Sequence, residues 1–194
     1  MKLNLVSCQF ALHYTFESLP QAEVLVKNAA ECLQAGGYFI GTIPDSNQFV
    51  SRVRKSNSNS FGNDIFKVTF DEDMNTAPPL FGLKYNFHLD GVVNCPEFLV
   101  HFPTFVELAK KYGLKLIKKE SFIDFYERMK VEGKSLLGVM RSLETYPPHD
   151  GTQLVGNDVH DYTHAEEFLQ DEGENIKLGT LSKSEWEASC RYPF

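Results

Sequence analysis

The fold class follows from residues 3–43, which read LNLVSCQFALHYTFESLPQAEVLVKNAAECLQAGGYFIGTI. The first part, Leu3–Leu12, is apolar nearly throughout, as expected of a parallel strand that is covered on both faces. Ser18–Gln21 has the composition of a capping box with proline in the first turn, so a helix begins there and runs to the stop signal Gly36-Gly37. A second apolar strand follows at Tyr38–Ile43. This order of strand, helix and strand predicts a right-handed crossover in a parallel sheet, and hence an α/β fold.

The rest of the chain continues this alternation less regularly. The run Leu80–Leu89 alternates apolar and polar residues, which predicts a strand with one buried face. We expect it to pair with a strand at Asp64–Phe70 as an antiparallel hairpin. A capping box at Ser182–Glu185 predicts a short helix around Trp186. The other predicted elements are helices at Gln48–Lys55, Pro103–Tyr112, Asp124–Leu143 and around Ala165–Leu169, and a strand at Leu114–Phe122.

The length of 194 residues suits one domain with its own core. We therefore expect a single domain over residues 1–194, with an α/β core at 1–143 that contains the hairpin insertion at about 61–95. An acidic lobe at 144–180 and a terminal segment at 181–194 complete the predicted organisation.

Composition narrows the class of protein. The formal net charge of −7 gives no global electrostatic footprint for duplex nucleic acid, although local lysine clusters leave room for contact with a single strand. The four cysteines lie far apart without metal-ligand spacing, which is typical of reduced thiols in an intracellular protein. No apolar run approaches a membrane span, and the first residues do not read as a signal peptide.

Polar and aromatic side chains gather at the predicted carboxyl ends of the two parallel strands. Gln9-Phe10 and His13-Tyr14 lie at or beyond the end of the first strand, and Thr42–Pro44 lies at or beyond the end of the second. Ligands of open parallel sheets bind at such ends, so we expect these residues to line one crevice.

Three other kinds of site are disfavoured. His160 and His164 have the spacing of a helical metal pair, but the adjacent glutamate of that motif is missing. The sequence has no G-x-S-x-G elbow, and Cys8 lies in the middle of a strand, which argues against hydrolase chemistry. A glycine-rich phosphate loop is also missing from the sequence.

Five segments of the chain resemble a known family. They read SCQFALHYTFES (7–18), AGGYFIGTIPDS (35–46), LFGLKYNFHLDGVVNCPEFLVHFP (80–103), AKKYGLKLIKK (109–119) and LGTLSKSEWEAS (178–189). Together they are similar to the carboxyl-terminal part of the eukaryotic mRNA cap guanine-N7 methyltransferases. The resemblance implies a partial class I S-adenosylmethionine-dependent methyltransferase (Rossmann-like) fold with an antiparallel hairpin insertion. The first strand here would be the fourth of that sheet, so the chain lacks the first three strands and most of the last strand.

The resemblance also implies which residues bind ligands. On sequence alone, Glu97 is more simply interpreted as a solvated loop carboxylate after Pro96, because isolated surface carboxylates are common. Its NCPEFLV context resembles that of the family and reverses this interpretation. No catalytic acid or base and no metal are implied, because guanine N7 has no proton to remove and the reaction needs positioning. Glu97 and His13 should then lie close together. The implied contacts are Gln9 and Tyr14 to S-adenosylmethionine, His13, Glu97 and Tyr192 to the cap guanine, and Phe10 and Pro44 as walls of the guanine pocket.

The implied function is transfer of a methyl group from S-adenosylmethionine to N7 of the GpppN cap of RNA, in the nucleus. Capped RNA is then a partner, and the acidic residues 146–177 would dock a small activating subunit. The glycine-rich loop and the acidic cofactor ligands of the family have no counterpart in this sequence. We therefore expect the chain alone to be marginally stable, to bind S-adenosylmethionine poorly in calorimetric titration, and to be inactive by itself.

Two alternatives remain open at this point. One is a non-catalytic shortened product that binds the activating subunit or capped RNA. A glycine-rich methyltransferase loop encoded in frame ahead of Met1 would argue against it. The other is a class I methyltransferase that acts on a small molecule, which a Glu97→Gln variant would distinguish.

Overall fold

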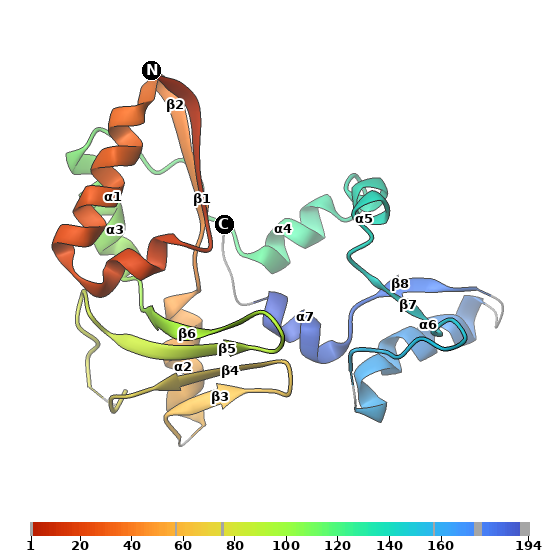
Figure 1. The fold of residues 1–194 in the computed structure, drawn as a ribbon. Helices are drawn as coiled ribbons and strands as arrows, with labels where there is room; N and C mark the ends of the chain where they lie inside the picture. The colour runs from red at the N-terminus through yellow and green to blue at the C-terminus, as the bar shows by residue number, and fades with distance from the viewer. Residues whose placement is uncertain (1, 57, 75, 157, 173–175, 191–194) are drawn as a thin grey trace. The chain divides into compact units, whose positions relative to one another are not determined.

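The computed structural model describes residues 2–56, 58–74, 76–156, 158–172 and 176–190 (Figure 1). Among them the chain divides into two compact units. The first unit contains the residues up to Phe122, and the second contains Ile123–Cys190. We predicted that residues 123–143 belong to the α/β core and that a lobe begins at residue 144. In the structure, residues 123–143 belong to the second unit.

The strand–helix–strand unit predicted from residues 3–43 is present. Strand β1 (Leu3–Gln9) pairs in parallel with β2 (Leu33–Thr42), and α1 (Leu19–Cys32) connects them. The helix ends at Cys32, so the predicted stop at Gly36-Gly37 is wrong. These glycines lie in β2 instead, where the register with β1 shifts and Gly36 has a φ of 79°. The glycines therefore mark a bulge in a strand.

The first strand is shorter than the sequence pattern predicts. It ends at Gln9, because Phe10 has a φ of 51° and turns the chain out of the extended conformation. A 3-10 helix, η1 (Leu12–Glu17), follows. Its Leu12 and Phe16 are buried in the main core of the first unit. Leu12, which the sequence pattern assigned to the strand, is therefore a core residue of a 3-10 helix.

The predicted hairpin is part of a larger sheet. Strands β4 (Phe66–Phe70) and β5 (Lys84–Leu89) pair in antiparallel fashion as expected. The sheet also contains β3 (Ser60–Gly62) and β6 (Val93–Phe98), in the order β3-β4-β5-β6. Glu97 is therefore a strand residue, and the loop interpretation of this position is wrong.

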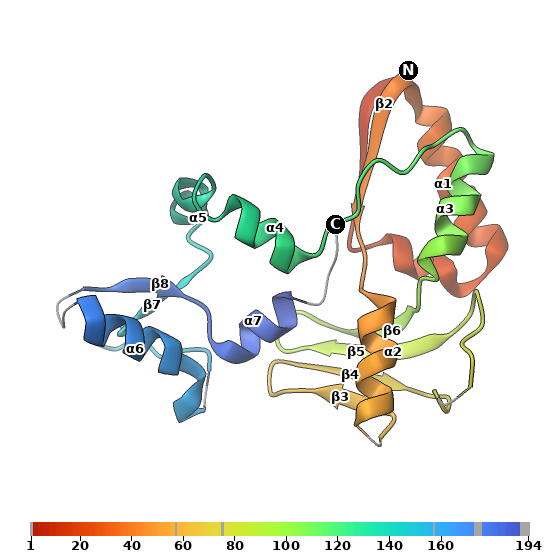
Figure 2. The same ribbon diagram turned by 180° about the vertical axis from the view of Figure 1, so that it is seen from behind.

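Helix α2 (Ser46–Lys55) lies across this sheet (Figure 2). The Asp45 side chain caps the helix by accepting hydrogen bonds from the backbone N–H groups of Asn47 and Gln48. Phe49 packs edge-on against Tyr85 of β5, with ring centroids 5.4 Å apart. This contact fixes the helix on the sheet that carries Glu97.

Helix α3 (Phe102–Lys111) contacts α1 beside the β1–β2 pair (Figure 1). The strand predicted at Leu114–Phe122 does not form: residues 114–120 have no regular structure, and α4 begins at Phe122. Ser121 forms a single bridge, which does not extend into a ladder among the described residues. The core that these elements share consists of Leu12, Phe16, Ala22, Val26, Ile43, Val100 and Leu108.

The second unit is built from short elements. The helix predicted at Asp124–Leu143 is divided at Gly133 into α4 (Phe122–Met129) and α5 (Lys134–Met140). The capping box at Ser182–Glu185 is confirmed, with both of its hydrogen bonds present. The other elements are β7 (Glu144–Tyr146), η2 (Val159–Tyr162), α6 (Thr163–Glu172), β8 (Leu178–Thr180) and α7 (Lys183–Ser189).

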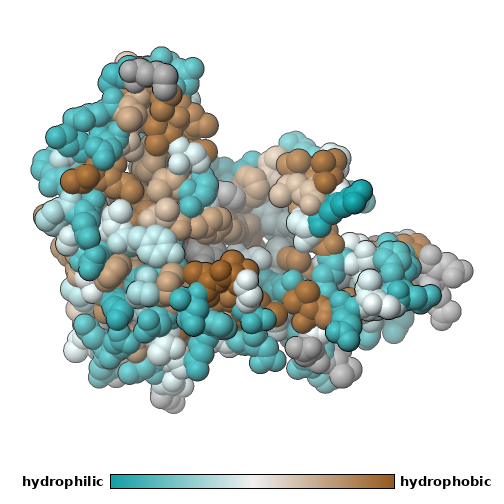
Figure 3. Space-filling model, viewed as in Figure 1, coloured by the Kyte–Doolittle hydropathy of each residue, from teal (hydrophilic) through white to brown (hydrophobic). Residues whose placement is uncertain are grey.

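Part of the first unit exposes an apolar face. An open trough of about 750 Å³ runs between α1 and the two parallel strands, lined by residues such as Val6, Val24 and Phe39. Figure 3 shows hydrophobic atoms along the same strands. None of the helices in the described ranges has the length and apolar character that crossing a membrane requires.

Candidate functional site

The candidate site forms where η1 packs against β6. The backbone N–H of Gly82 donates to the carbonyl of Phe16 at 2.9 Å, and the rings of Phe16 and Phe81 stack with centroids 5.1 Å apart. Because these contacts link η1 to the segment before β5, the side chains of η1 lie against the neighbouring strand β6. His13 and Tyr14 are thereby brought to Glu97.

The carboxylate of Glu97 is the centre of this cluster. It is 3% exposed and accepts a hydrogen bond on Oε2 from the Tyr85 hydroxyl at 2.8 Å. Oε1 accepts from the Tyr14 hydroxyl at 3.3 Å and lies 3.2 Å from Nε2 of His13. A buried carboxylate is tolerated only when its oxygens are satisfied in this way. The predicted proximity of positions 13 and 97 is confirmed.

The imidazole of His13 retains hydrogen-bonding capacity. The side chain is 1% exposed, and its approach to Glu97 is not aligned as a hydrogen bond. Within the described residues, neither ring nitrogen has a hydrogen-bond partner. Buried polar atoms are nearly always paired in proteins, so an orphaned pair of ring nitrogens beside a carboxylate indicates a place for a polar ligand.

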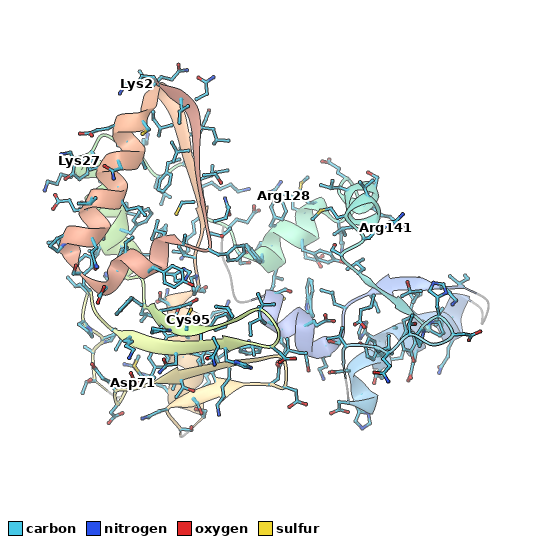
Figure 4. The ribbon with its side chains drawn as sticks, in the orientation of Figure 1. Lys2, Lys27, Asp71, Cys95, Arg128 and Arg141 are labelled. Atoms are coloured by element: carbon cyan, nitrogen blue, oxygen red, sulfur yellow. The ribbon has the colours of Figure 1, made fainter. Side chains whose placement is uncertain are left out.

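Tyr14 stays a neutral phenol in this setting. Burial is the main cause that raises its pKa above the usual range, helped by its contact with Cys95 and by the negative charge of Glu97. Its hydroxyl lies 3.5 Å from Sγ of Cys95, which Figure 4 labels on β6. Tyr14 therefore acts as a hydrogen-bond donor, and its ring, 4.4 Å from that of His13, offers an aromatic face.

The end of β1 supplies two more of the predicted residues. Gln9 is the last strand residue, and its side-chain amide donates to Ser7 at 2.9 Å. The backbone N–H of Phe10 donates to both Thr42 oxygens, with the Oγ1 contact at 2.9 Å. The Phe10 ring is 47% exposed and meets Phe122 edge-on, at a centroid distance of 6.3 Å. Both side chains lie at the carboxyl end of the parallel pair, as the sequence predicts.

Of the predicted guanine-pocket residues, Pro44 lies apart from the Glu97 cluster. Pro44 lines a separate small pocket of about 130 Å³, together with residues such as Pro79 and His101, and neither His13 nor Glu97 lines that pocket. Tyr192 lies outside the described residues. Sequence reasoning also missed two members of the cluster, Tyr85 and Cys95. The alternation of β5 marks Tyr85 as a buried strand position. Cys95 lies on β6, whose sequence does not alternate in this way.

Within the described ranges, no three His, Cys, Asp or Glu side chains gather closely enough to hold a metal ion. His160 lies in η2, and His164 of α6 has its Nε2 2.9 Å from Oγ1 of Thr180. One histidine of the pair, His164, thus contacts the hydroxyl of Thr180 through its Nε2.

Comparison with known proteins identifies the family. The sequence model of the mRNA (guanine-N(7))-methyltransferase domain matches residues 1–193. The chain belongs to this family. It is similar to proteins called mRNA cap guanine-N(7) methyltransferase from Drosophila melanogaster (48% identity over 194 residues, covering 99% of this chain and 44% of that protein) and Caenorhabditis elegans (42% over 195 residues, covering 97% and 50%). The chain thus spans about half the length of these relatives.

A solved structure is also similar, the CcbJ methyltransferase from Streptomyces caelestis, with 15% identity and a TM-score of 0.42. That likeness covers 62% of this chain and 49% of the other. The family assignment rests on the sequence matches.

Proposed function

We propose that this chain forms the carboxyl-terminal part of an mRNA cap guanine-N7 methyltransferase, which transfers a methyl group from S-adenosylmethionine to N7 of the GpppN cap of RNA. The observation that supports this most strongly is the Glu97 carboxylate, buried against His13 and Tyr14 just beyond the end of β1. A carboxylate accepts from two neighbouring N–H donors, and guanine offers such a pair in N1–H and its exocyclic amine.

The chemistry asks little of the protein beyond positioning. Guanine N7 carries a neutral lone pair, so no general base has to remove a proton. S-adenosylmethionine supplies a methyl group that is already activated by its sulfonium. The task of the site is to hold guanine in line with that methyl group and to exclude water. The purine gains positive charge as the methyl arrives, and the negative charge of Glu97 stabilises it.

The residues at the end of β1 suit one side of a methyl donor. Gln9 presents an amide at the strand terminus, and Tyr14 presents an aromatic face. Aromatic faces favour cationic groups such as a sulfonium. These two residues would bind and orient the donor, while Phe10 would contribute to the wall between donor and guanine.

We further propose that the protein acts in the nucleus. We also propose that its second unit docks a small activating subunit. Helix α6 exposes Glu166, Glu167 and Asp171, with the half-exposed Phe168 on the same helix. An acidic surface with an apolar centre is complementary to a small basic subunit. Pull-down of such a subunit should be lost when Glu166 and Glu167 are both changed to Lys; retention would exclude α6 as the docking surface.

A second candidate function is non-catalytic binding of capped RNA or of the activating subunit. It is favoured by the position of the Glu97 cluster, which lies wholly within the first unit of this chain and could hold guanine without the donor.

The decisive experiment uses a chimera in which this chain replaces the matching region of the Drosophila relative. We expect Glu97→Gln to lower kcat/KM for capped RNA by about a hundredfold, because the amide NH₂ opposes a guanine donor. Binding of S-adenosylmethionine should be unchanged. Glu23→Gln is the matched control, since Glu23 also accepts a hydrogen bond from a tyrosine hydroxyl but lies outside the cluster.

The outcomes separate the candidates. Full activity of the Glu97→Gln chimera would exclude guanine recognition at this site. A wild-type chimera that binds a GpppA cap dinucleotide but methylates neither capped RNA nor free GTP would favour the non-catalytic function.

A further inference from the structure

Tyr85 is a buried polar residue that contacts Glu97 and has no role in the mechanism proposed above. Its side chain is 0% exposed, and its ring is held between Phe49 and Phe70, with centroid distances of 5.4 and 5.5 Å. Its hydroxyl donates to Oε2 of Glu97 at 2.8 Å. A ring fixed in this way cannot move its hydroxyl, so the hydrogen bond has a fixed origin.

The sheet register determines this contact. Tyr85 on β5 and Glu97 on β6 are directly opposite each other in the antiparallel pair, so their side chains project from the same face. The shorter and fully buried contact of Tyr85 contrasts with that of Tyr14, which is 39% exposed and lies 3.3 Å from Oε1. Tyr85 is therefore the stronger of the two anchors of the carboxylate.

Orientation matters because the terminal torsion of a glutamate is soft. A carboxylate rotates over a broad range about that bond unless its oxygens are held. Each carboxylate oxygen has about two acceptor positions. Tyr85 holds Oε2 and Tyr14 holds Oε1, so each oxygen keeps capacity for one further hydrogen bond, beside His13, whose Nε2 lies 3.2 Å from Oε1. A carboxylate with capacity on both oxygens can accept from two neighbouring N–H groups together.

We propose that Tyr85 is a positioning residue that gives the site its preference for guanine, by holding the plane of the Glu97 carboxylate so that it accepts from N1–H and the exocyclic amine together. This inference rests on the proposed function. Without the Tyr85 hydrogen bond, the carboxylate still meets N1–H, but its second oxygen leaves the line of the amine. Discrimination between guanine and a base without that amine then falls.

The test measures discrimination by comparing two substrates in the Drosophila chimera. RNA capped with guanosine is compared with RNA capped with inosine, which lacks the exocyclic amine. We expect Tyr85→Phe to lower the ratio of the two kcat/KM values about tenfold, mainly through the KM for guanosine-capped RNA. The KM for S-adenosylmethionine should not change.

The matched control is Tyr112→Phe. Tyr112 also donates its hydroxyl to a carboxylate, Oε1 of Glu23 at 2.6 Å, but lies outside the Glu97 cluster. Its substitution should leave the guanosine-to-inosine ratio unchanged. Because the ratio is measured on one preparation, partial unfolding of a variant cancels from it. If Tyr85→Phe yields no folded protein, Glu97→Asp serves instead, since the shorter side chain withdraws the carboxylate from Tyr85 and should lower the same ratio.

The outcomes distinguish the two proposals. Loss of activity in Glu97→Gln with an unchanged ratio in Tyr85→Phe would overturn the role of Tyr85 and leave the proposed function standing. Full activity in Glu97→Gln would overturn the proposed function itself. A fall in the ratio in Tyr85→Phe but not in Tyr112→Phe supports the role of Tyr85.

Discussion

Phe10 directly follows β1 and turns the chain toward the Glu97 cluster. Its φ of 51° is uncommon for a residue with a side chain and costs free energy. The cost is offset by Thr42, whose buried hydroxyl and carbonyl both accept from the Phe10 N–H. This turn ends β1 and begins η1, and it thereby delivers His13 and Tyr14 to Glu97.

Removal of the Thr42 hydroxyl should weaken this turn. Thr42→Val keeps the shape of the side chain but loses the Oγ1 acceptor, so we expect the free energy of unfolding to fall by about 1 kcal/mol. Urea denaturation of the 194-residue chain, followed by circular dichroism, measures it. Thr42→Ser retains the acceptor and should lose clearly less. Equal stability of the Val variant and the wild type would show that the hydroxyl does not support the turn.

Single residues differ in how far the sequence alone reveals them. Gln9 and His13 were predicted from their position at or beyond the end of an apolar strand, because such ends open onto ligands. Glu97 needed the family resemblance, since an isolated carboxylate after a proline has no pattern of its own. Tyr85 could be predicted only as a buried strand position. Its contact with Glu97 depends on the register of β5 with β6, and β6 itself was not predicted.

The elements that could be predicted are those with strong local signals. Helices α1, α2 and α3 begin at capping or proline residues and carry apolar stripes, and all three are present. Strand β6 was missed because Pro96 interrupts it, which is tolerated since β6 is at the edge of the sheet in the described structure. The segment at 114–122 has strand composition, but within the described residues it forms a bridge at Ser121 and no longer ladder, and composition does not reveal how far pairing extends.

The capping box of α7 makes the free energy of unfolding depend on pH through the Glu185 carboxyl. Burial is the main cause that raises the pKa of the Glu185 carboxyl, so the folded protein keeps this proton to a higher pH than the unfolded chain does. The free energy of unfolding therefore falls as the pH rises from the unfolded pKa through the folded one, and the deficit persists at neutral pH. Glu185→Gln removes this loss and keeps an acceptor for the Ser182 N–H.

We expect the Glu185→Gln variant to be more stable than the wild type at pH 7 by about 0.5 kcal/mol, the scale for a partly solvated carboxylate. Below about pH 4, where both proteins carry a neutral side chain, the difference should vanish. Fluorescence of Trp186, the single tryptophan of the chain, reports the unfolding of α7. Ser182→Ala, which breaks the box, should be less stable at both pH values. A constant difference between Glu185→Gln and the wild type would contradict the assignment.

On the scale of the whole molecule, one unit holds the complete Glu97 cluster. The residues of the cluster come from η1, β5 and β6 of the first unit, and they are His13, Tyr14, Tyr85, Cys95 and Glu97. The same unit carries the open apolar trough beside β1, and the chain spans about half the length of its relatives. The proposed function thus depends on this cluster as a guanine-binding site.

A crystal structure of the Drosophila chimera with a GpppA cap dinucleotide tests this claim most directly. The distances from guanine N1 and the exocyclic amine to the Glu97 carboxylate are the quantities to measure. We predict that both nitrogens lie within about 3.2 Å of the carboxylate oxygens, a hydrogen-bonding distance, with an imidazole nitrogen of His13 in contact with the base. A guanine bound elsewhere, with the Glu97 carboxylate still held only by protein groups, would contradict it.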